Sequence, residues 1–280
     1  MFFDEAKAAY LRKFHVSISS SCISVILKNT GLSWKALEQR AVQISQADVI
    51  RFASELLETP WLLHNLLFLD EVSFDNRQMI RNCGWWYKGE RLVLCGEYKR
   101  LPRVSLLCFI GLNGLVNTHM TQGTFNRELF LDCCLQTATK QKVVKMNPGW
   151  HSLWILDGAK IHCDPSVVNS LRLIGVKIIF LPAYCPFFNP IEIMFGMVKK
   201  RMRRVYNPNR GDDILHVILD VLGEFKRHDF ESIFRQCGYT WSGFDPTTAF
   251  SIPFSDMHGI KSDGEEIWDV GDVGDYELTE

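Results

Sequence analysis

The chain has 280 residues, of which 47% are hydrophobic and 22% are charged, the composition of an ordinary soluble globular protein with a sizeable core. Lysine and arginine number 31 and aspartate and glutamate 32, so the formal net charge is -1. No run approaches the roughly eighteen apolar residues that a membrane span needs, and residues 1–13 carry charges where a signal peptide needs an apolar core. We therefore expect a protein that is neither secreted nor membrane-spanning.

The nine cysteines are odd in number and show no C-x-x-C spacing. Most of them, such as Cys95 and Cys108, lie inside apolar runs. This usage is typical of reduced intracellular thiols rather than of a disulfide framework or a zinc site.

The charges are distributed unevenly along the chain. Five cations fall within residues 199–204, whereas residues 256–280 hold nine acids against the single Lys261. We expect residues 237–280 to form an acidic, flexible C-terminal tail.

Residues 1–45 have the pattern of a partial helix-turn-helix. Asp4 can cap a helix to about Phe14, and Ser19 can cap a second helix at residues 20–28. The second helix would turn Ile23, Ile26 and Leu27 inward. Its outward side chains, which could approach a DNA groove or phosphates, are Ser20, Ser21, Ser24 and Lys28. A plain pair of antiparallel helices is an equally good interpretation.

Residues 46–65 predict a helical connector, and residues 66–236 predict the main domain. Its strands are expected in the apolar runs 66–71, 104–111, 115–120, 152–157 and 176–181. Asn113-Gly114 is a strong hairpin signal, so the second and third strands should be antiparallel. Helices are expected at 126–142, near 165–174, from 190, at 212–226 and near 230–235. Three strands followed by alternating helices and strands predict an α/β fold, a mixed sheet with helices on both faces.

The segment between residues 73 and 102 is irregular and rich in aromatic residues. We predict a hairpin or clamp-like insertion, in which Lys88 and Arg91 could contact DNA. The alternative is that its aromatic residues form a small satellite core.

Two buried strands each stop at an acid. Asp70 follows LLFL and Asp157 follows LWIL, and the active sites of open α/β sheets gather at strand carboxyl ends. The two aspartates are therefore candidates to face one another, although either could instead accept backbone hydrogen bonds in the next turn.

A third acid begins the helix that follows the last strand. Asn189 and Pro190 predict the N-cap and first helical residue, which places Glu192 in the first turn. Further along this helix, Lys199, Lys200 and Arg203 are expected to contact phosphates rather than bases. A glutamate behind an asparagine cap is also an ordinary helix-start signature with no chemistry. Three carboxylates without a histidine cluster suit Mg²⁺ or Mn²⁺, and two such ions would support in-line phosphoryl displacement.

These segments resemble the DDE transposases of the mariner-like superfamily. The resemblance covers about residues 15–207 and is carried by four stretches: FLDE at 68–71, CGWWYKGER at 83–91, LDGAKIH at 156–162 and LPAYCPFFNPIEIMFGMVKK at 181–200. The order of these stretches and the thirty-four residues between Asp157 and Glu192 agree with the aspartate, aspartate, glutamate variety of that family.

The resemblance implies a ribonuclease H-like catalytic domain that cuts and joins DNA strands in the nucleus. It implies that Asp70, Asp157 and Glu192 are the catalytic triad and bind Mg²⁺ or Mn²⁺, as two ions. DNA is the expected partner, with a homodimer on paired DNA ends as the expected assembly. The alternative is a domesticated or decayed copy that binds DNA or protein without catalysis.

Three further residues are expected to support the triad. Glu71 should lie outside the direct ligands, since adjacent strand residues point to opposite faces. His162 could orient the Asp157 loop or support DNA, and Asn189 is placed beside Glu192. The sequence departs from the family at Gly158, where asparagine is usual, at Phe187-Phe188, where a more polar pair is usual, and in its short N-terminal region.

Overall fold

The computed structural model describes residues 3–32, 44–76, 79, 87, 89–91, 93, 102–140, 143–207 and 213–250. The described residues divide into two compact units, residues 3–32 and residues 44–250.

The N-terminal unit is a pair of helices, α1 (Phe3–Phe14) and α2 (Ser20–Asn29). As expected, Ser19 caps α2, and its hydroxyl accepts a hydrogen bond of 3.1 Å from the amide of Cys22. The predicted inward face is wrong in part. Ile23 is buried, but Ile26 is 47% exposed, because two helices can cover only one narrow stripe of α2.

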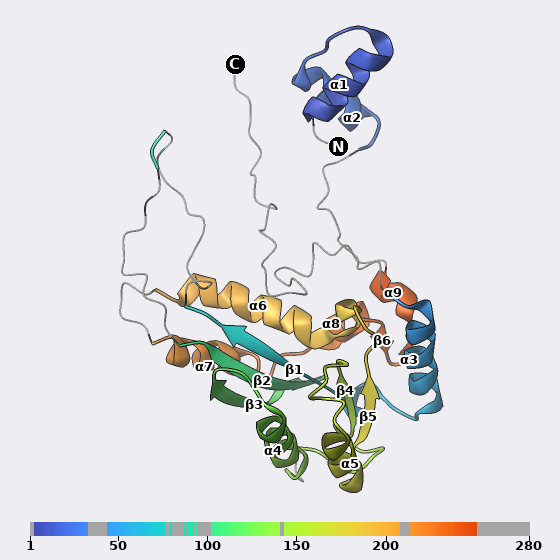
Figure 1. Ribbon diagram of the computed structural model, residues 1–280, viewed down its shortest axis with the longest axis vertical. Coiled ribbons are helices and arrows are strands. Elements are labelled where there is room, and N and C mark those ends of the chain that lie inside the picture. The colour runs from blue at the N-terminus through green and yellow to red at the C-terminus, as the bar shows by residue number, and fades with distance from the viewer. Residues whose placement is uncertain are drawn as a thin grey trace. The chain divides into compact units, whose positions relative to one another are not determined.

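The second unit is built on a five-stranded sheet in the order β3-β2-β1-β4-β5 (Figure 1). The strands are β1 (Leu66–Phe74), β2 (Val104–Gly111), β3 (Gly114–Gln122), β4 (Leu153–Leu156) and β5 (Lys177–Phe180). β2 is antiparallel to both β1 and β3, whereas β4 and β5 run parallel to β1. The predicted mixed sheet is confirmed.

The tight turn between β2 and β3 requires its glycine. Gly114 has a φ of 122°, and a β-carbon there would lie 2.6 Å from the carbonyl oxygen of Phe225. The amide of Leu115 donates to that same oxygen over 2.8 Å. The hairpin is thereby joined to the chain that follows the seventh helix.

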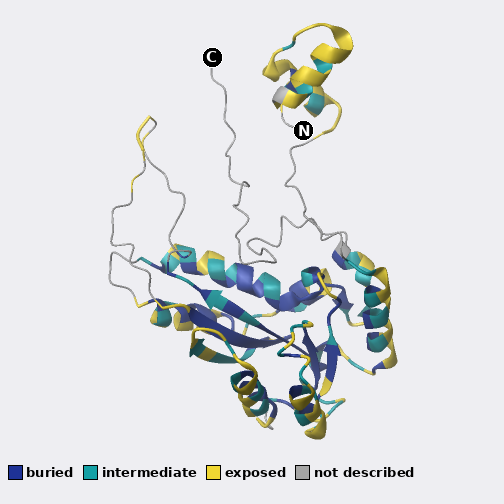
Figure 2. Cartoon of the chain, viewed as in Figure 1, coloured by how far each residue is buried: buried dark blue, intermediate teal, exposed yellow. Residues whose placement is uncertain are grey.

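Helices cover both faces of the sheet (Figures 1 and 2). The side chains of α3 (Gln46–Glu58), α6 (Pro190–Val205), α7 (Ile214–Glu224) and α8 (Glu231–Gln236) share one core with alternate residues of β1. The side chains of α4 (Arg127–Ala138) and α5 (Pro165–Leu173) share a second core with the other residues of β1. Within the described ranges, no helix is long and apolar enough to cross a membrane.

The packing bears on two of the expected segments. The expected connector 46–65 holds α3, whose Phe52 is fully buried, and the short 3₁₀ turn Leu63–Asn65. The expected tail begins with packed structure, namely β6 (Tyr239–Thr240), β7 (Gly243–Phe244) and α9 (Pro246–Phe250). Tyr239 is fully buried and its hydroxyl donates to the carbonyl of Phe188 over 2.9 Å. Aromatic burial outweighs the weak periodicity of this stretch, and residues 251–280 lie outside the described ranges.

Candidate active site

Asp70 lies in β1, and Asp157 directly follows the neighbouring parallel strand β4. The register of β1 and β4 pairs Phe68 with Ile155, and each aspartate lies two residues beyond its member of that pair. Side chains alternate along a strand, so each aspartate is expected on the same face as the residue two positions before it. Those residues, Phe68 and Ile155, pack in the core on the α6 side of the sheet. One expectation is corrected: Asp70 lies within β1, which continues to Phe74 because β2 pairs with it there.

Glu192 approaches from α6, and Asn189 links that helix to Asp70. Asn189 is at the N-cap, as expected, but its side chain does not cap α6. Instead its Nδ2 donates to Oδ2 of Asp70 over 3.1 Å, because the side chain is 2% exposed and faces β1. Oδ1 of Asn189 is the one buried side-chain N or O atom in the described ranges that has no hydrogen-bond partner.

The three carboxylates affect one another's pKa. Burial, then the charges of Glu192 and Asp157, raise the pKa of Asp70 well above its usual value. Burial raises the pKa of Glu192 to about 7, with Lys199 opposing the shift and Asp157 adding to it. Like charges raise each other's pKa only when they are close, so Glu192 and Asp157 both lie near Asp70.

Asp157 is held by His162. Nδ1 of His162 is hydrogen-bonded to Oδ1 of Asp157, Nε2 lies 3.3 Å from Oε1 of Glu71, and the ring stacks on Phe130 at 4.4 Å. Burial lowers the pKa of His162, but its bonds to the two carboxylates outweigh burial and raise it to about 10. Burial likewise raises the pKa of Asp157, yet the bond to His162 leaves it below the ordinary value. The structure therefore brings Glu71, His162 and Asp157 together.

The chemistry of the donor set fits a hard divalent cation. Carboxylate oxygens are the ligands that Mg²⁺ and Mn²⁺ prefer, and the unpartnered Oδ1 of Asn189 is a further oxygen of the same kind. Across the described residues, no three His, Cys, Asp or Glu side chains converge as a ready ligand set. The oxygens of Asp70 are instead engaged by Asn189 and by the amide of Glu71, at 3.1 and 2.7 Å.

The expected DNA-binding residues fall into separate places. On α6, Lys199 and Arg203 are half-buried and Lys200 is exposed, while Arg201 makes a bidentate ion pair with Glu224 at 2.9 to 3.0 Å. Ser20, Ser21 and Lys28 are exposed and Ser24 is half-buried, all in the N-terminal unit. Arg91 is exposed, and Lys88 lies outside the described residues, as does most of the expected insertion.

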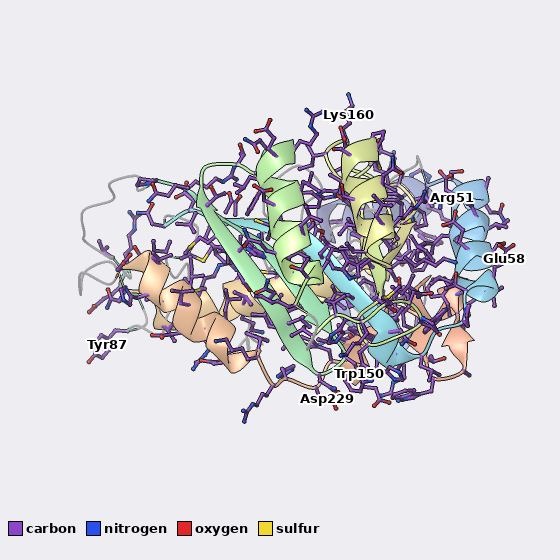
Figure 3. All side chains as sticks on the ribbon, turned by 90° about the horizontal axis from the view of Figure 1, so that it is seen from below. Arg51, Glu58, Tyr87, Trp150, Lys160 and Asp229 are labelled. Atoms are coloured by element: carbon purple, nitrogen blue, oxygen red, sulfur yellow. The ribbon has the colours of Figure 1, made fainter. Side chains whose placement is uncertain are left out.

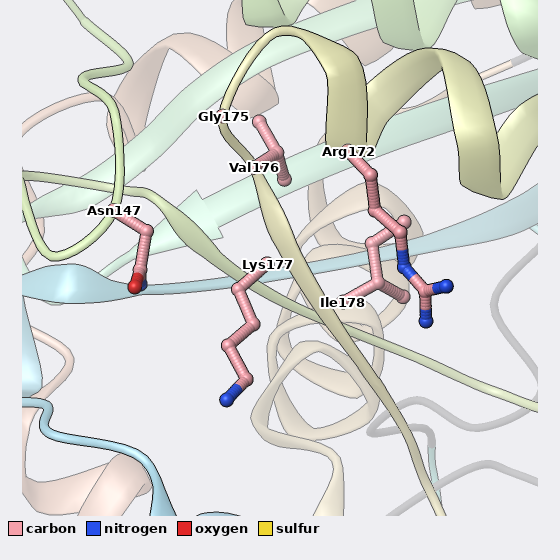
Figure 4. Close-up of a pocket in the computed structure, with 6 residues that line it drawn as sticks. All are labelled: Asn147, Arg172, Gly175, Val176, Lys177 and Ile178. Atoms are coloured by element: carbon pink, nitrogen blue, oxygen red, sulfur yellow. The ribbon is translucent and has the colours of Figure 1, made fainter.

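A shallow hollow of about 410 Å³ lies elsewhere, at the amino end of β5 (Figure 4). It is lined by Asn147, Arg172, Gly175, Val176, Lys177 and Ile178. Since Asp157 follows the carboxyl end of the neighbouring parallel strand, this hollow is not part of the carboxylate site.

Comparison with solved structures identifies the fold as ribonuclease H-like. The "Mos1 mariner paired end complex with Mn" is 14% identical, with a TM-score of 0.60 over 92% of this chain and 79% of that chain. The "Mos1 transposase paired-end complex with left transposon end" is 13% identical, with a TM-score of 0.58 over 90% and 78%. The "Mos1 transposase catalytic domain and Raltegravir with Mn" is 14% identical, with a TM-score of 0.52 over 81% and 100%.

The sequence comparison then shows the family. Residues 65–215, a span that contains all three carboxylates, match the DDE superfamily endonuclease family, and the chain belongs to it. No curated protein matches the chain significantly.

Proposed function

We propose that this protein is a transposase that cleaves and joins DNA strands by divalent-metal-dependent phosphoryl transfer. The observation that carries the proposal is the hydrogen bond of 3.1 Å from Asn189 to Asp70, which brings the start of α6, with Glu192, against β1 beside the parallel strand that Asp157 follows. All three acids lie within the span that matches the endonuclease family. Similar structures include a Mos1 complex with a left transposon end and Mos1 paired-end complexes with Mn and with Mg, which supports DNA as the partner and these ions as cofactors.

In this proposal Asp70, Asp157 and Glu192 hold two ions of Mg²⁺ or Mn²⁺. When bound, such ions neutralise charge on the phosphate and lower the pKa of the attacking hydroxyl or water. Asn189 keeps Asp70 in place, and His162 with Glu71 keeps Asp157 in place. In cleavage a water oxygen bonds to phosphorus while the bond to the 3′ oxygen breaks. In joining, the freed 3′ hydroxyl attacks a phosphate of a second DNA, whose own 3′ oxygen leaves.

The proposed assembly is a homodimer on paired DNA ends, which matches the paired-end complexes named among similar structures. The proposed location is the nucleus, where its DNA substrate would be found.

The decisive experiment is a strand-cleavage assay on duplexes that carry the terminal sequences flanking the gene. We expect cleavage with Mg²⁺ or Mn²⁺ and none with EDTA. Asp157→Asn should abolish cleavage while DNA affinity without metal stays near the native value, because cations supply most of the phosphate affinity. Asp220→Asn removes an exposed acid of α7 and is the matched control.

The second candidate is a DNA- or protein-binding module without catalysis. It is favoured because, among the described residues, no three His, Cys, Asp or Glu side chains are positioned together to hold a metal ion. DNA binding by the native protein without cleavage in either metal, unchanged by Asp157→Asn, would establish this candidate and reject the enzyme.

A further inference from the structure

Tyr184 stands out in the loop that joins β5 to α6. Its neighbours Leu181, Cys185 and Phe187 are buried, between 3 and 6% exposed, whereas Tyr184 is 56% exposed. Within the described residues, no hydrogen bond and no ring contact engages its side chain. The loop is thus anchored by apolar side chains and presents one large aromatic ring to solvent.

The backbone at Tyr184 is strained. Its φ is 60°, in the left-handed region that a residue with a bulky side chain rarely adopts. Such a conformation persists only where the surroundings impose it, and strain of this kind is concentrated at functional sites. Here the buried residues on either side fix the loop. The ring of Tyr184 is therefore exposed to solvent while its backbone stays in the strained left-handed conformation.

Both ends of the loop are tied to the candidate site. At its start, the amide of Leu181 donates to the carbonyl of Leu156 over 2.8 Å, which places Leu181 level with Asp157. At its end, Asn189 is bonded to Asp70. Tyr184 is therefore three residues beyond the level of Asp157 and five residues before Asn189.

One exposed cation at this edge of the sheet is Lys160, in the loop after Asp157. Nη2 of Arg51 donates to the carbonyl of Phe180 over 3.2 Å, but its Nη1 is paired with Glu55 at 2.9 Å. Lys160 and Arg51 are labelled in Figure 3, where Lys160 and Trp150 lie at opposite ends of the strands. An exposed aromatic ring on a loop that starts level with Asp157, together with the exposed Lys160 after Asp157, has the components of a platform for an unpaired nucleobase, since bases stack on aromatic rings while a cation attracts the phosphates.

We propose that Tyr184 stacks on an unpaired base next to the phosphate at which the DNA is cut. This inference rests on the proposed function and adds a residue that positions the strand end. The ring supplies the interaction, so phenylalanine can replace tyrosine, whereas alanine and glycine cannot. Tyr184→Gly removes the ring but adopts a positive φ without strain, so its effect reports on the loss of the ring and not on a change of the backbone.

The test uses the full chain and a duplex with a short 3′ overhang in which one base is 2-aminopurine, whose fluorescence is quenched by stacking. The measurements are made in EDTA, so that no strand is cut. We expect the native protein and Tyr184→Phe to quench the probe. Tyr184→Ala and Tyr184→Gly should lose the quenching and bind the overhang duplex about tenfold more weakly, with unchanged affinity for a blunt duplex. Trp150→Ala removes an exposed ring at the opposite end of the strands and should behave as native.

Each outcome has a defined meaning. Quenching that survives in Tyr184→Ala, or a loss in Tyr184→Phe equal to that in Tyr184→Ala, overturns the stacking role while the native cleavage assay still supports the transposase. Native behaviour in Tyr184→Gly overturns it too, because the ring would then be dispensable. A native protein that binds neither duplex overturns both the stacking role and the proposed function.

Discussion

Asn189 is joined to Asp70 by a hydrogen bond of 3.1 Å from the amide Nδ2 to the carboxylate Oδ2, across 119 positions of sequence. The bond ties the residue before α6 to the middle of β1. In this orientation the amide nitrogen donates to Asp70, whereas a flipped amide would place its oxygen against Oδ2 of Asp70. Because Glu192 follows Asn189 by one turn, this bond also sets where Glu192 lies relative to Asp70.

We predict that Asn189→Ala weakens Mn²⁺ binding about ten- to a hundredfold, the usual cost of removing a residue that orients a metal ligand. Titration calorimetry of the full chain measures it. Asn126→Ala removes a side-chain bond at the start of α4, remote from the acids in sequence, and should leave Mn²⁺ binding unchanged. Equal losses in the two variants would contradict the positioning role.

Removing the cations of α6 should weaken DNA binding uniformly. Lys199→Ala and Arg203→Ala remove charges expected to meet phosphates, so each should lower the slope of log affinity against log salt by about one. Filter binding with several unrelated duplexes over a range of salt checks this. Arg201→Ala is the matched control, because Arg201 is already paired with Glu224. A loss confined to one DNA sequence would show that Lys199 or Arg203 reads bases.

Tyr239→Phe should lower the free energy of unfolding by about 1–3 kcal/mol. The change leaves the buried carbonyl of Phe188 without the hydroxyl that donates to it. Urea denaturation measures the loss, and Tyr184→Phe, which alters an exposed ring, should change stability little. Equal stability of native and Tyr239→Phe proteins would count against residues 239–250 being part of the folded core.

The stability of the second unit should depend on pH through His119. Nε2 of His119 lies 2.9 Å from Nδ2 of Asn117 and from Oγ1 of Thr137. Burial, then the charge of Lys140, lowers the pKa of His119, so the folded state favours the neutral ring. The unfolded chain takes up this proton near pH 6.5. The contribution of His119 is therefore complete above that pH and is lost as the pH falls toward the lower folded pKa.

The corresponding variant is His119→Asn, which cannot titrate. Between about pH 7.5 and pH 5.5 it should lose less free energy of unfolding than the native protein, as measured by urea denaturation. Parallel profiles for His119→Asn and the native protein would refute this role of His119.

Much of the sheet and the placing of the acids could be predicted from local sequence patterns. Apolar runs that stop at Asp70 and Asp157 indicated two buried strands, and β1 and β4 are found there as parallel neighbours. Asn113-Gly114 indicated the hairpin, because the positive φ of such a turn needs a glycine. Glu71 and Asp70 were expected on opposite faces, since strand side chains alternate.

Tertiary contacts decided what local patterns could not. The side chain of Asn189 could either cap α6 or form a hydrogen bond with a distant acid. It bonds to Asp70 because the fold brings β1 close to the start of α6. Tyr239 lies in a stretch with little periodicity, yet aromatic neighbours far away in sequence bury it. Ile26 fits the inward stripe of its helix but is exposed, because burial depends on a partner surface that a helical pattern does not supply. Periodicity and turn chemistry are local properties of the chain, whereas the partners of a buried polar group depend on which distant segments the fold brings together.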